Sequence, residues 1–270
     1  MVDFTFKERY TYEDLLEVMR ILRSPQGCVW DREQDHKSIR RSFIEETYEA
    51  VEAIDNDDPV LLQEELGDVL LQVVFHAQIE TEAGRFTMDD VADGICKKMI
   101  YRHPHVFGTT EVKTSDDVLQ NWDALKQKEK HQNTVTDTLE SVARSLPGLI
   151  RAEKVQHKAA KVGFDWDDLS GALEKVREET EEVARAADGD GNLSEELGDL
   201  LFAAVNVARF AHADPEQAIQ DATDKFVRRF SKVEQAAQKA GKSLTAMSLA
   251  EMDTLWDAVK AEENEAEEHE

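Results

Sequence analysis

The chain has 270 residues, and 41% of them are apolar, so it can bury a hydrophobic core as one large domain or as two of ordinary size. Its 58 acidic and 32 basic residues give a formal net charge of −26, which repels the backbone of nucleic acids and the surface of anionic lipid. We therefore expect no direct nucleic-acid binding and no membrane partner, and a small polyanion would need divalent cations or a local group of Lys and Arg.

The cysteines and the apolar runs indicate a compartment. Cys28 and Cys96 are the two cysteines and form no CxxC motif, which favours a reducing environment over a disulfide framework. The first residues lack the basic-then-apolar order of a secretory signal, and no apolar run approaches the roughly 20 residues that span a membrane. We expect a cytoplasmic protein.

Helix signals occur along the whole chain, whereas no segment shows a convincing strand alternation. Three segments have the spacing of N-terminal capping boxes, and a fourth has an Asp before a Pro at the first helical position: Thr11 with Asp14, Thr87 with Asp90, Ser248 with Glu251, and Asp214 with Pro215. Apolar residues then recur every three or four positions. The sequence predicts an all-α protein with helices near 11–23, 38–56, 59–84, 87–102, 115–130, 147–160, 170–187, 192–213, 215–240 and 248–264.

Long segments of the first half recur in the second half in the same order. FIEETYEAVEAIDNDDPVLLQEELGDVLLQVVF parallels KVREETEEVARAADGDGNLSEELGDLLFAAVNV, KKMIYRH parallels DKFVRRF, and NWDALKQKE parallels LWDAVKAEE, at nearly constant offsets. We interpret the chain as a tandem duplication of one all-α unit. The predicted domains are 1–131 and 132–262, with HQNTVTDT as a polar linker without helical periodicity and 263–270 as a disordered acidic tail.

Acidic residues gather on one face of two consecutive helices in each half. Glu178, Glu179 and Glu182 share an arc of one helix, because residues three and four apart lie on the same face. The short, turn-rich AADGDGNL connection should place this helix antiparallel to the next. The facing acidic residues are then Glu195, Glu196 and Asp199, and the first half repeats the arrangement with Glu45, Glu46 and Glu49 opposite Glu64, Glu65 and Asp68.

A solvated helix face is the usual explanation of acidic residues at this spacing in so acidic a chain. Here, however, Glu196 and Asp199 flank Leu197 and Leu200, so the carboxylates adjoin the apolar stripe, and the whole pattern occurs twice. Facing carboxylates need a counter-cation, because their pKa values would otherwise rise. All-oxygen ligation favours Mg²⁺ or Mn²⁺, and the absence of a Glu-x-x-His pair argues against a di-iron bundle.

Gly67 and Gly198 lie inside the two motif helices, where glycine is unfavourable. The missing side chain would allow a neighbouring helix or a ligand to approach closely, and core packing alone would explain it equally well.

Basic and aromatic residues recur beyond the carboxylates. Two Lys/Arg pairs have helical spacing, Lys98 with Arg102 and Lys225 with Arg229, and two Trp/Lys pairs follow, Trp122 with Lys126 and Trp256 with Lys260. Ion pairing within the helix is the usual role of such cations, but their recurrence in both halves suggests clamps for phosphate oxygens. The tryptophans are either stacking faces or core anchors.

The motifs EETEE…EELGD and EETYE…EELGD resemble the EExxE…ExxD signature of MazG-type nucleoside triphosphate pyrophosphohydrolases. GCVWDREQ, RRSFIEETYEA, RHPHVF, SLPGLIRAEKVQ and GFDW strengthen the resemblance to two-domain bacterial members, and it covers almost the whole chain except the acidic tail. The chain has CVWD at 28–31 where the family usually has CPWD, a difference that we expect to affect a turn and not the chemistry.

The resemblance implies an all-α fold with four-helix-bundle-like packing that is completed by a homodimer. It implies Mg²⁺-dependent hydrolysis of a nucleoside triphosphate between the α and β phosphates, with a monophosphate and pyrophosphate as products. The second unit is expected to be catalytic, although the first unit retains every motif carboxylate.

Residue roles follow from the same resemblance. The implied metal ligands are Glu179, Glu182, Glu196 and Asp199, with Glu178 as a water-orienting base, and Glu46, Glu49, Glu65 and Asp68 with Glu45 are their first-unit equivalents. The implied nucleotide contacts are Lys225 and Arg229 to the triphosphate and Trp256 and Lys260 near the nucleotide, with Lys98, Arg102, Trp122 and Lys126 as the first-unit candidates.

Two other functions fit the same residues. One is a non-catalytic scaffold that binds metal or nucleotide for regulation. The other is a relative with narrower substrates, such as a dUTP or dCTP pyrophosphatase or a phosphoribosyl-ATP hydrolase, against which the full-length two-unit pattern argues.

Overall fold

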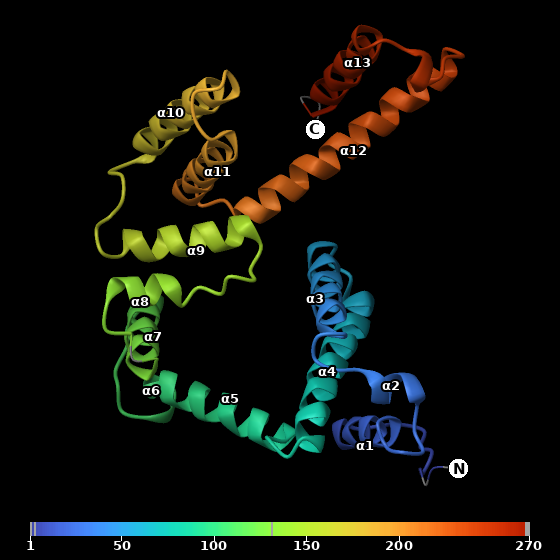
Figure 1. Cartoon of the computed structure of the whole chain (residues 1–270), viewed down its shortest axis with the longest axis vertical. Helices are drawn as coiled ribbons and strands as arrows, with labels where there is room; N and C mark the ends of the chain where they lie inside the picture. The colour runs from blue at the N-terminus through green and yellow to red at the C-terminus, as the bar shows by residue number, and fades with distance from the viewer. Residues whose placement is uncertain (1, 3, 131, 268–270) are drawn as a thin grey trace. The chain divides into compact units, whose positions relative to one another are not determined.

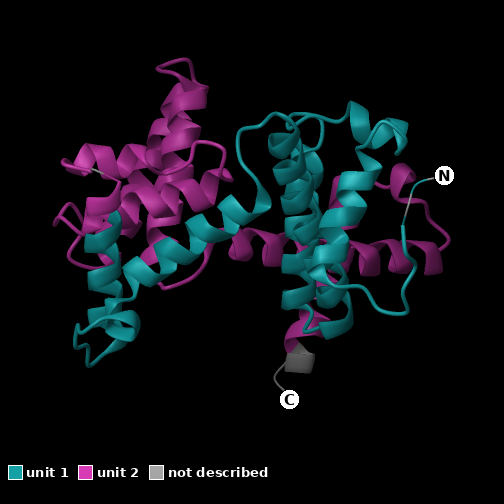
Figure 2. Ribbon diagram, turned by 90° about the horizontal axis from the view of Figure 1, so that it is seen from below, with its two compact units in different colours: residues 1–126 teal, residues 127–270 magenta. Residues whose placement is uncertain are grey.

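The computed structural model describes residues 2, 4–130 and 132–267, and none of these residues lies in a β-strand. The prediction of an all-α fold is therefore confirmed. The chain divides into two compact units, 1–126 and 127–270, and the change from one to the other falls within a single helix, α7 (Figure 2). Among the described helices, none combines the length and the apolar character that a membrane crossing requires.

The first unit is built around a pair of long helices (Figure 1). Its helices are α1 (Tyr12–Leu22), α2 (Val29–Glu33), α3 (Arg40–Asp55), α4 (Pro59–Glu82), α5 (Met88–Arg102), α6 (Pro104–Phe107) and α7 (Ser115–Glu129). α3 packs along α4, and α1 packs against the C-terminal part of α4 through a core of Met19, Ile39, Val74 and Phe75. This core fixes the carboxyl half of α4 and leaves its amino half, with the EELGD motif, against α3.

Arg23 joins α1 to α4 at the edge of that core. Its side chain is almost fully buried, and its Nε and Nη2 each donate to a carboxylate oxygen of Glu82 at 2.9 Å. The guanidinium also lies over the ring of Phe75, 5.3 Å from its centroid, and donates to the carbonyl of Asp31. A charge that is buried with this many partners stabilises the orientation of α1 and α2 relative to α4.

The second unit repeats the helix pair and adds a long hairpin (Figure 1). Its elements are α8 (Val135–Glu140), α9 (Gly148–Ala160), α10 (Leu169–Ala187), α11 (Leu193–Phe210), α12 (Pro215–Lys239), the 3₁₀ turn η1 (Leu244–Ala246) and α13 (Leu249–Glu267). α10 packs along α11, α9 packs across α11, and α13 folds back along α12. The acidic and the basic motifs of this unit therefore lie on two different helical hairpins.

The predicted helix starts agree with the structure. The capping boxes of Thr11 and Thr87 are both formed, Ser248 and Glu251 exchange the same pair of bonds, and Asp214 accepts from the amides of Glu216 and Gln217. All the predicted helices are present with ends shifted by a few residues. The short helices α2, α6 and α8 and the turn η1 were not predicted, because each is too short to show an apolar period.

The predicted linker contains the start of a helix. Thr134 caps α8 and exchanges hydrogen bonds with Asp137, so the second half of HQNTVTDT is helical, whereas His131 lies outside the described residues. α13 continues to Glu267, which makes 263–267 helical, and the last part of the predicted tail, 268–270, lies outside the described residues. The domain boundaries at 131 and 262 stay predictions.

Candidate functional site

A tight turn brings α10 and α11 together. Asn192 caps α11 by accepting from the amide of Ser194, and Gly189 and Gly191 supply the positive φ angles of +99° and +127° that reverse the chain. The two helices pack along each other, and small residues are buried in both, namely Ala172 and Ala186 of α10 and Ala203 of α11. Because the two helices approach closely, acidic side chains of one can reach those of the other.

Glu179 of α10 meets Glu196 and Asp199 of α11. Each of the three carboxylates offers an oxygen that lies within 4.8 Å of the others. Glu179 is 4% exposed, and its Oε2 is buried without a hydrogen-bond partner among the described residues. Burial raises the pKa of Glu196 first, and the nearby charges of Glu182 and Asp199 raise it further. An unsatisfied buried carboxylate oxygen among repelling carboxylates fits a divalent cation.

The other two acidic residues of α10 lie at the margin of this cluster. The charge of Glu182 is close enough to raise the pKa of Glu196, and Glu182 accepts a hydrogen bond from Arg185 at 3.1 Å. Glu178 is exposed and accepts from Lys175 at 3.0 Å. The structure thus brings three of the four predicted metal ligands into the closest group, with Glu182 next to it.

Lys175 is the residue of this site that the sequence patterns missed. Its Nζ lies 2.6 Å from Oε1 of Glu179, and the hydrogen bonds to Glu179 and Glu178 raise its pKa far above the ordinary value. Its position one helical turn before the two glutamates was a usable signal. The repeat concealed that signal, because Ser42 occupies the corresponding position of the first unit.

The first unit forms a similar cluster with a different membership. Glu46 and Glu49 of α3 and Glu65 of α4 offer oxygens within 4.8 Å of one another, and Glu65 is 9% exposed. Burial is the main cause that raises the pKa values of Glu46 and Glu65, and Asp68 raises both further. Asp68 itself is not in the closest group. A divalent cation fits this donor set too, since it would relieve the same repulsion.

Gly67 and Gly198 face open space. A Cβ placed on either glycine would have no described atom within 4 Å apart from those of its own chain neighbours and of the backbone of its own helix. Close packing within the chain, which was one of their two expected roles, therefore does not explain them. The space above both glycines is open to a ligand or to another protein chain.

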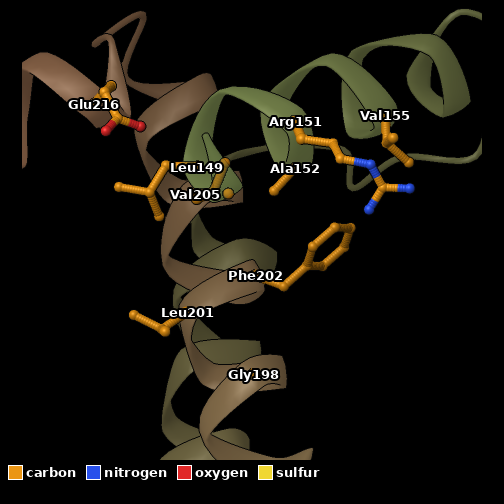
Figure 3. A pocket seen from close by; sticks show the side chains of 10 residues that line it. Leu149, Arg151, Ala152, Val155, Gly198, Leu201, Phe202, Val205 and Glu216 are labelled. Carbon is orange, nitrogen blue, oxygen red and sulfur yellow. The ribbon is translucent and has the colours of Figure 1, made fainter. Parts of the chain in front are cut away.

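A cavity of about 420 Å³ opens beside Gly198, between α9, α11 and the start of α12 (Figure 3). Most of its lining is apolar, and the lining includes Leu149, Ala152, Val155, Leu201, Phe202 and Val205, with Arg151 and Glu216 as charged members. Leu201 and Phe202 are about half exposed. The side of α11 next to the acidic motif therefore presents apolar surface that the chain itself does not cover.

The predicted nucleotide contacts of the second unit lie on the α12–α13 hairpin. Arg229 of α12 donates through Nε to Glu263 of α13 at 2.6 Å, and the half-buried Trp256 packs against Phe226 with 5.2 Å between ring centroids. Lys225 and Lys260 are exposed. Within the described residues, no hydrogen bond or ion pair joins this hairpin to the carboxylates of α10 and α11, so the structure does not bring the two predicted parts of the site into contact.

The equivalent residues of the first unit are arranged differently. The guanidinium of Arg102 lies over Trp122, 5.3 Å from the ring centroid, and the ring of His103 packs on the same tryptophan at 4.9 Å. Arg102 is buried, and Lys98 and Lys126 are half-buried. The tryptophan face that was expected to stack on a nucleotide is thus in contact with the protein's own side chains.

Two features define the class of this all-α protein. One pair of helices carries opposed acidic groups, and the helices that follow carry basic and tryptophan side chains. Such a protein is suited to bind a polyanion that chelates a metal ion. The family described as the MazG nucleotide pyrophosphohydrolase domain matches the chain twice, over residues 34–107 and 169–234. The chain belongs to this family.

Relatives agree with this assignment. The nucleoside triphosphate pyrophosphohydrolase/pyrophosphatase MazG of Thermotoga maritima is 44% identical over 249 residues, which cover 92% of this chain and 95% of that protein. The nucleoside triphosphate pyrophosphohydrolase of Escherichia coli K12 is 44% identical over 254 residues, or 92% of this chain and 97% of that protein. The uncharacterized protein YabN of Bacillus subtilis is 48% identical over 94% of this chain, which corresponds to 52% of its own length.

Proposed function

We propose that this protein hydrolyses nucleoside triphosphates between the α and β phosphates and releases a nucleoside monophosphate and pyrophosphate. The observation that carries the proposal is the buried Oε2 of Glu179, which lacks a partner and lies in a group of carboxylates in a member of a pyrophosphohydrolase family. Mg²⁺ is the proposed cofactor, with Mn²⁺ as a substitute, because the donors are all carboxylate oxygens.

Glu179, Glu182, Glu196 and Asp199 would hold the metal in the second unit, and Glu46, Glu49, Glu65 and Asp68 are the candidates in the first. When bound, Mg²⁺ shields the charge of the triphosphate and lowers the pKa of an attacking water. We propose Glu178 as the group that acts on that water: its Oε1 accepts from Lys175, and its Oε2 would take a proton as the new bond to the α-phosphorus forms. The bond from the α-phosphorus to the bridging oxygen then breaks, and pyrophosphate leaves.

Lys225 and Arg229 would bind the phosphates, with Trp256 and Lys260 near the base and sugar. Basic groups in these places stabilise the negative charge that develops on the pyrophosphate leaving group. Lys98, Arg102, Trp122 and Lys126 are the corresponding candidates of the first unit. The contact of Arg102 with Trp122 favours the second unit as the place of catalysis.

A homodimer is part of the proposal. The outward side of α11 exposes Leu193, Leu197, Leu201 and Phe202, and Gly198 among them has open space above it. A second copy would cover this apolar surface and would supply the packing between helix pairs that a four-helix bundle requires. It would also bring further helices to the carboxylates, which the α12–α13 hairpin of the same chain does not contact. We propose a cytoplasmic location for the assembly.

The direct test is pyrophosphate release from a mixture of nucleoside triphosphates with and without Mg²⁺. We expect release that depends on Mg²⁺ and is lost in Asp199→Asn, because a metal ligand is removed while α11 keeps its fold. Glu181→Gln is the matched control, since Glu181 is an exposed acidic residue of α10 outside the cluster. A wild-type protein that binds Mg²⁺ and triphosphate without any turnover would instead be a regulatory scaffold.

A further inference from the structure

Glu263 forms a carboxylate bridge between α12 and α13. Its Oε2 accepts from Nε of Arg229 at 2.6 Å, and its Oε1 accepts from Nζ of Lys232 at 2.7 Å. The side chain is 21% exposed, so water screens the bridge only in part. The hydrogen bonds from Lys232 and Arg229 lower the pKa of Glu263 from its usual 4.5 to about 2, so the bridge stays charged at any pH near neutrality.

The bridge engages one edge of the arginine. Arg229 donates to Glu263 through Nε, and among the described residues its two Nη groups make no hydrogen bond. A guanidinium presents its donors as a rigid planar fork. Because the bond to Glu263 uses Nε, the Nη donors at the end of the fork stay available to an anion.

The same bridge sets the register of the hairpin. Lys260 and Trp256 lie about one and two helical turns before Glu263, so the three residues share a face of α13. Phe226 lies one turn before Arg229 on α12 and packs against Trp256. The ion pair of Glu263 with Arg229 and the contact of Trp256 with Phe226 together fix the position of α13 along α12.

We propose that Glu263 is a positioning residue for the nucleotide: it aims the Nη donors of Arg229 at the phosphates and holds α13 so that Trp256 and Lys260 meet the same molecule. The inference rests on the proposed function, in which those three residues bind a nucleoside triphosphate. Arg102, the first-unit equivalent of Arg229, adopts a different arrangement, because its guanidinium covers the ring of Trp122.

The test compares Glu263→Ala and Glu263→Gln with wild type in the full chain. We measure KM and kcat by pyrophosphate release, and the Kd of a non-hydrolysable nucleoside triphosphate in the presence of Mg²⁺. Loss of a charged hydrogen bond should raise KM and Kd roughly 10-fold and change kcat less. Glu263→Gln keeps an acceptor for Arg229 and should recover part of the loss. Glu262→Ala, at the neighbouring exposed position, is the control and should match wild type.

Arg229→Ala and the double variant show whether Glu263 acts through the arginine. If it does, Glu263→Ala adds little to the loss caused by Arg229→Ala, because the two effects are coupled. An unchanged or lower KM in Glu263→Ala overturns the inference. So does a variant in which kcat and the melting temperature both fall and in which Glu263→Gln recovers neither. A wild-type protein that fails to bind the analogue refutes the proposed function instead, which separates the two failures.

Discussion

The two units carry the same acidic motif residues but bring different members of the motif together. In the first unit α3 provides two members of the closest group, Glu46 and Glu49, and α4 provides one. In the second unit α10 provides one, Glu179, and α11 provides two. A repeated motif therefore determines which helix faces are acidic, whereas small differences in helix packing decide which oxygens meet.

The units also differ in their internal cations. Lys175 pairs with Glu179 in the second unit, and Ser42 stands at the equivalent position of the first. In the first unit burial and mutual repulsion raise the pKa values of both Glu46 and Glu65, while no lysine in the described structure is paired with that cluster. The comparison teaches that Lys175 neutralises part of the negative charge of the second site before any metal binds. The first site depends more on an added cation or proton to relieve the repulsion between its carboxylates.

The largest expected effect separates the units by activity. Glu179→Gln should reduce pyrophosphate release by more than about 100-fold, because it removes the buried ligand of the second site. The equivalent change, Glu46→Gln, should cost much less, because we place catalysis in the second unit. Steady-state rates at saturating Mg²⁺ measure both. Equal losses in the two variants would show that both units work, and a larger loss in Glu46→Gln would reverse the assignment.

An intermediate effect concerns Mg²⁺ affinity. Lys175→Ser gives the second unit the residue of the first, and it should bind Mg²⁺ roughly 5-fold more tightly, because about 1 kcal/mol of competition from the ammonium group is removed. Isothermal titration calorimetry measures the affinity. Ser42→Lys is the reciprocal variant, and weaker Mg²⁺ binding is expected in the first unit. Weaker binding in Lys175→Ser would show that the lysine organises the carboxylates and does not compete for them.

The smallest expected effect is on the way that thermal stability depends on pH. The folded-state pKa of Glu196 is raised, so the folded protein binds more protons than the unfolded chain, and stability falls as pH rises from 4.5 through the raised pKa. Metal-free Glu196→Gln should therefore melt about 2–4 °C above wild type at pH 8 and no higher at pH 4. Glu181→Gln should show no such difference, and Mg²⁺ should stabilise wild type more than it stabilises Glu196→Gln, which keeps the first-unit cluster. A variant that melts below wild type at pH 8 would contradict the repulsion.

Acid should destabilise the protein through a different group. The hydrogen bonds from Arg85 and His36 hold the pKa of Glu80 at about 2, below its usual 4.5. The stability that this pairing contributes is complete above pH 4.5 and is lost as pH falls toward 2. Metal-free protein should accordingly be most stable near pH 4.5, where the two ranges meet.

Much of the fold was predictable because its signals are local. The caps at Thr87 and Asp214 and the three-to-four apolar period each depend on residues within one helix, and the structure confirms them. The acidic faces of α10 and α11 followed from the same local geometry. The capping box of Thr134 was equally local, but the polar composition of its segment concealed the short helix α8 that it starts.

The missed residues depend on contacts that spacing alone does not decide. The bridge from Glu263 to Arg229 joins two helices, and the spacing of residues within one helix does not say which residues of the other helix they meet. Lys175 departs from the repeat, because Ser42 stands at its position in the first unit. The separation of the α12–α13 hairpin from the carboxylates could not be predicted either, because the repeat gives the order of the motifs and not their distance.

Gly67 and Gly198 leave bare backbone on the open side of α4 and of α11. Each lowers the stability of its helix by about 1 kcal/mol relative to alanine, and within the described residues no other segment would collide with an alanine methyl group at either place. The isolated chain would therefore tolerate the more stable residue. What the two glycines offer in exchange is space, because a ligand or a second chain can come closer to the backbone of either helix than an alanine would permit.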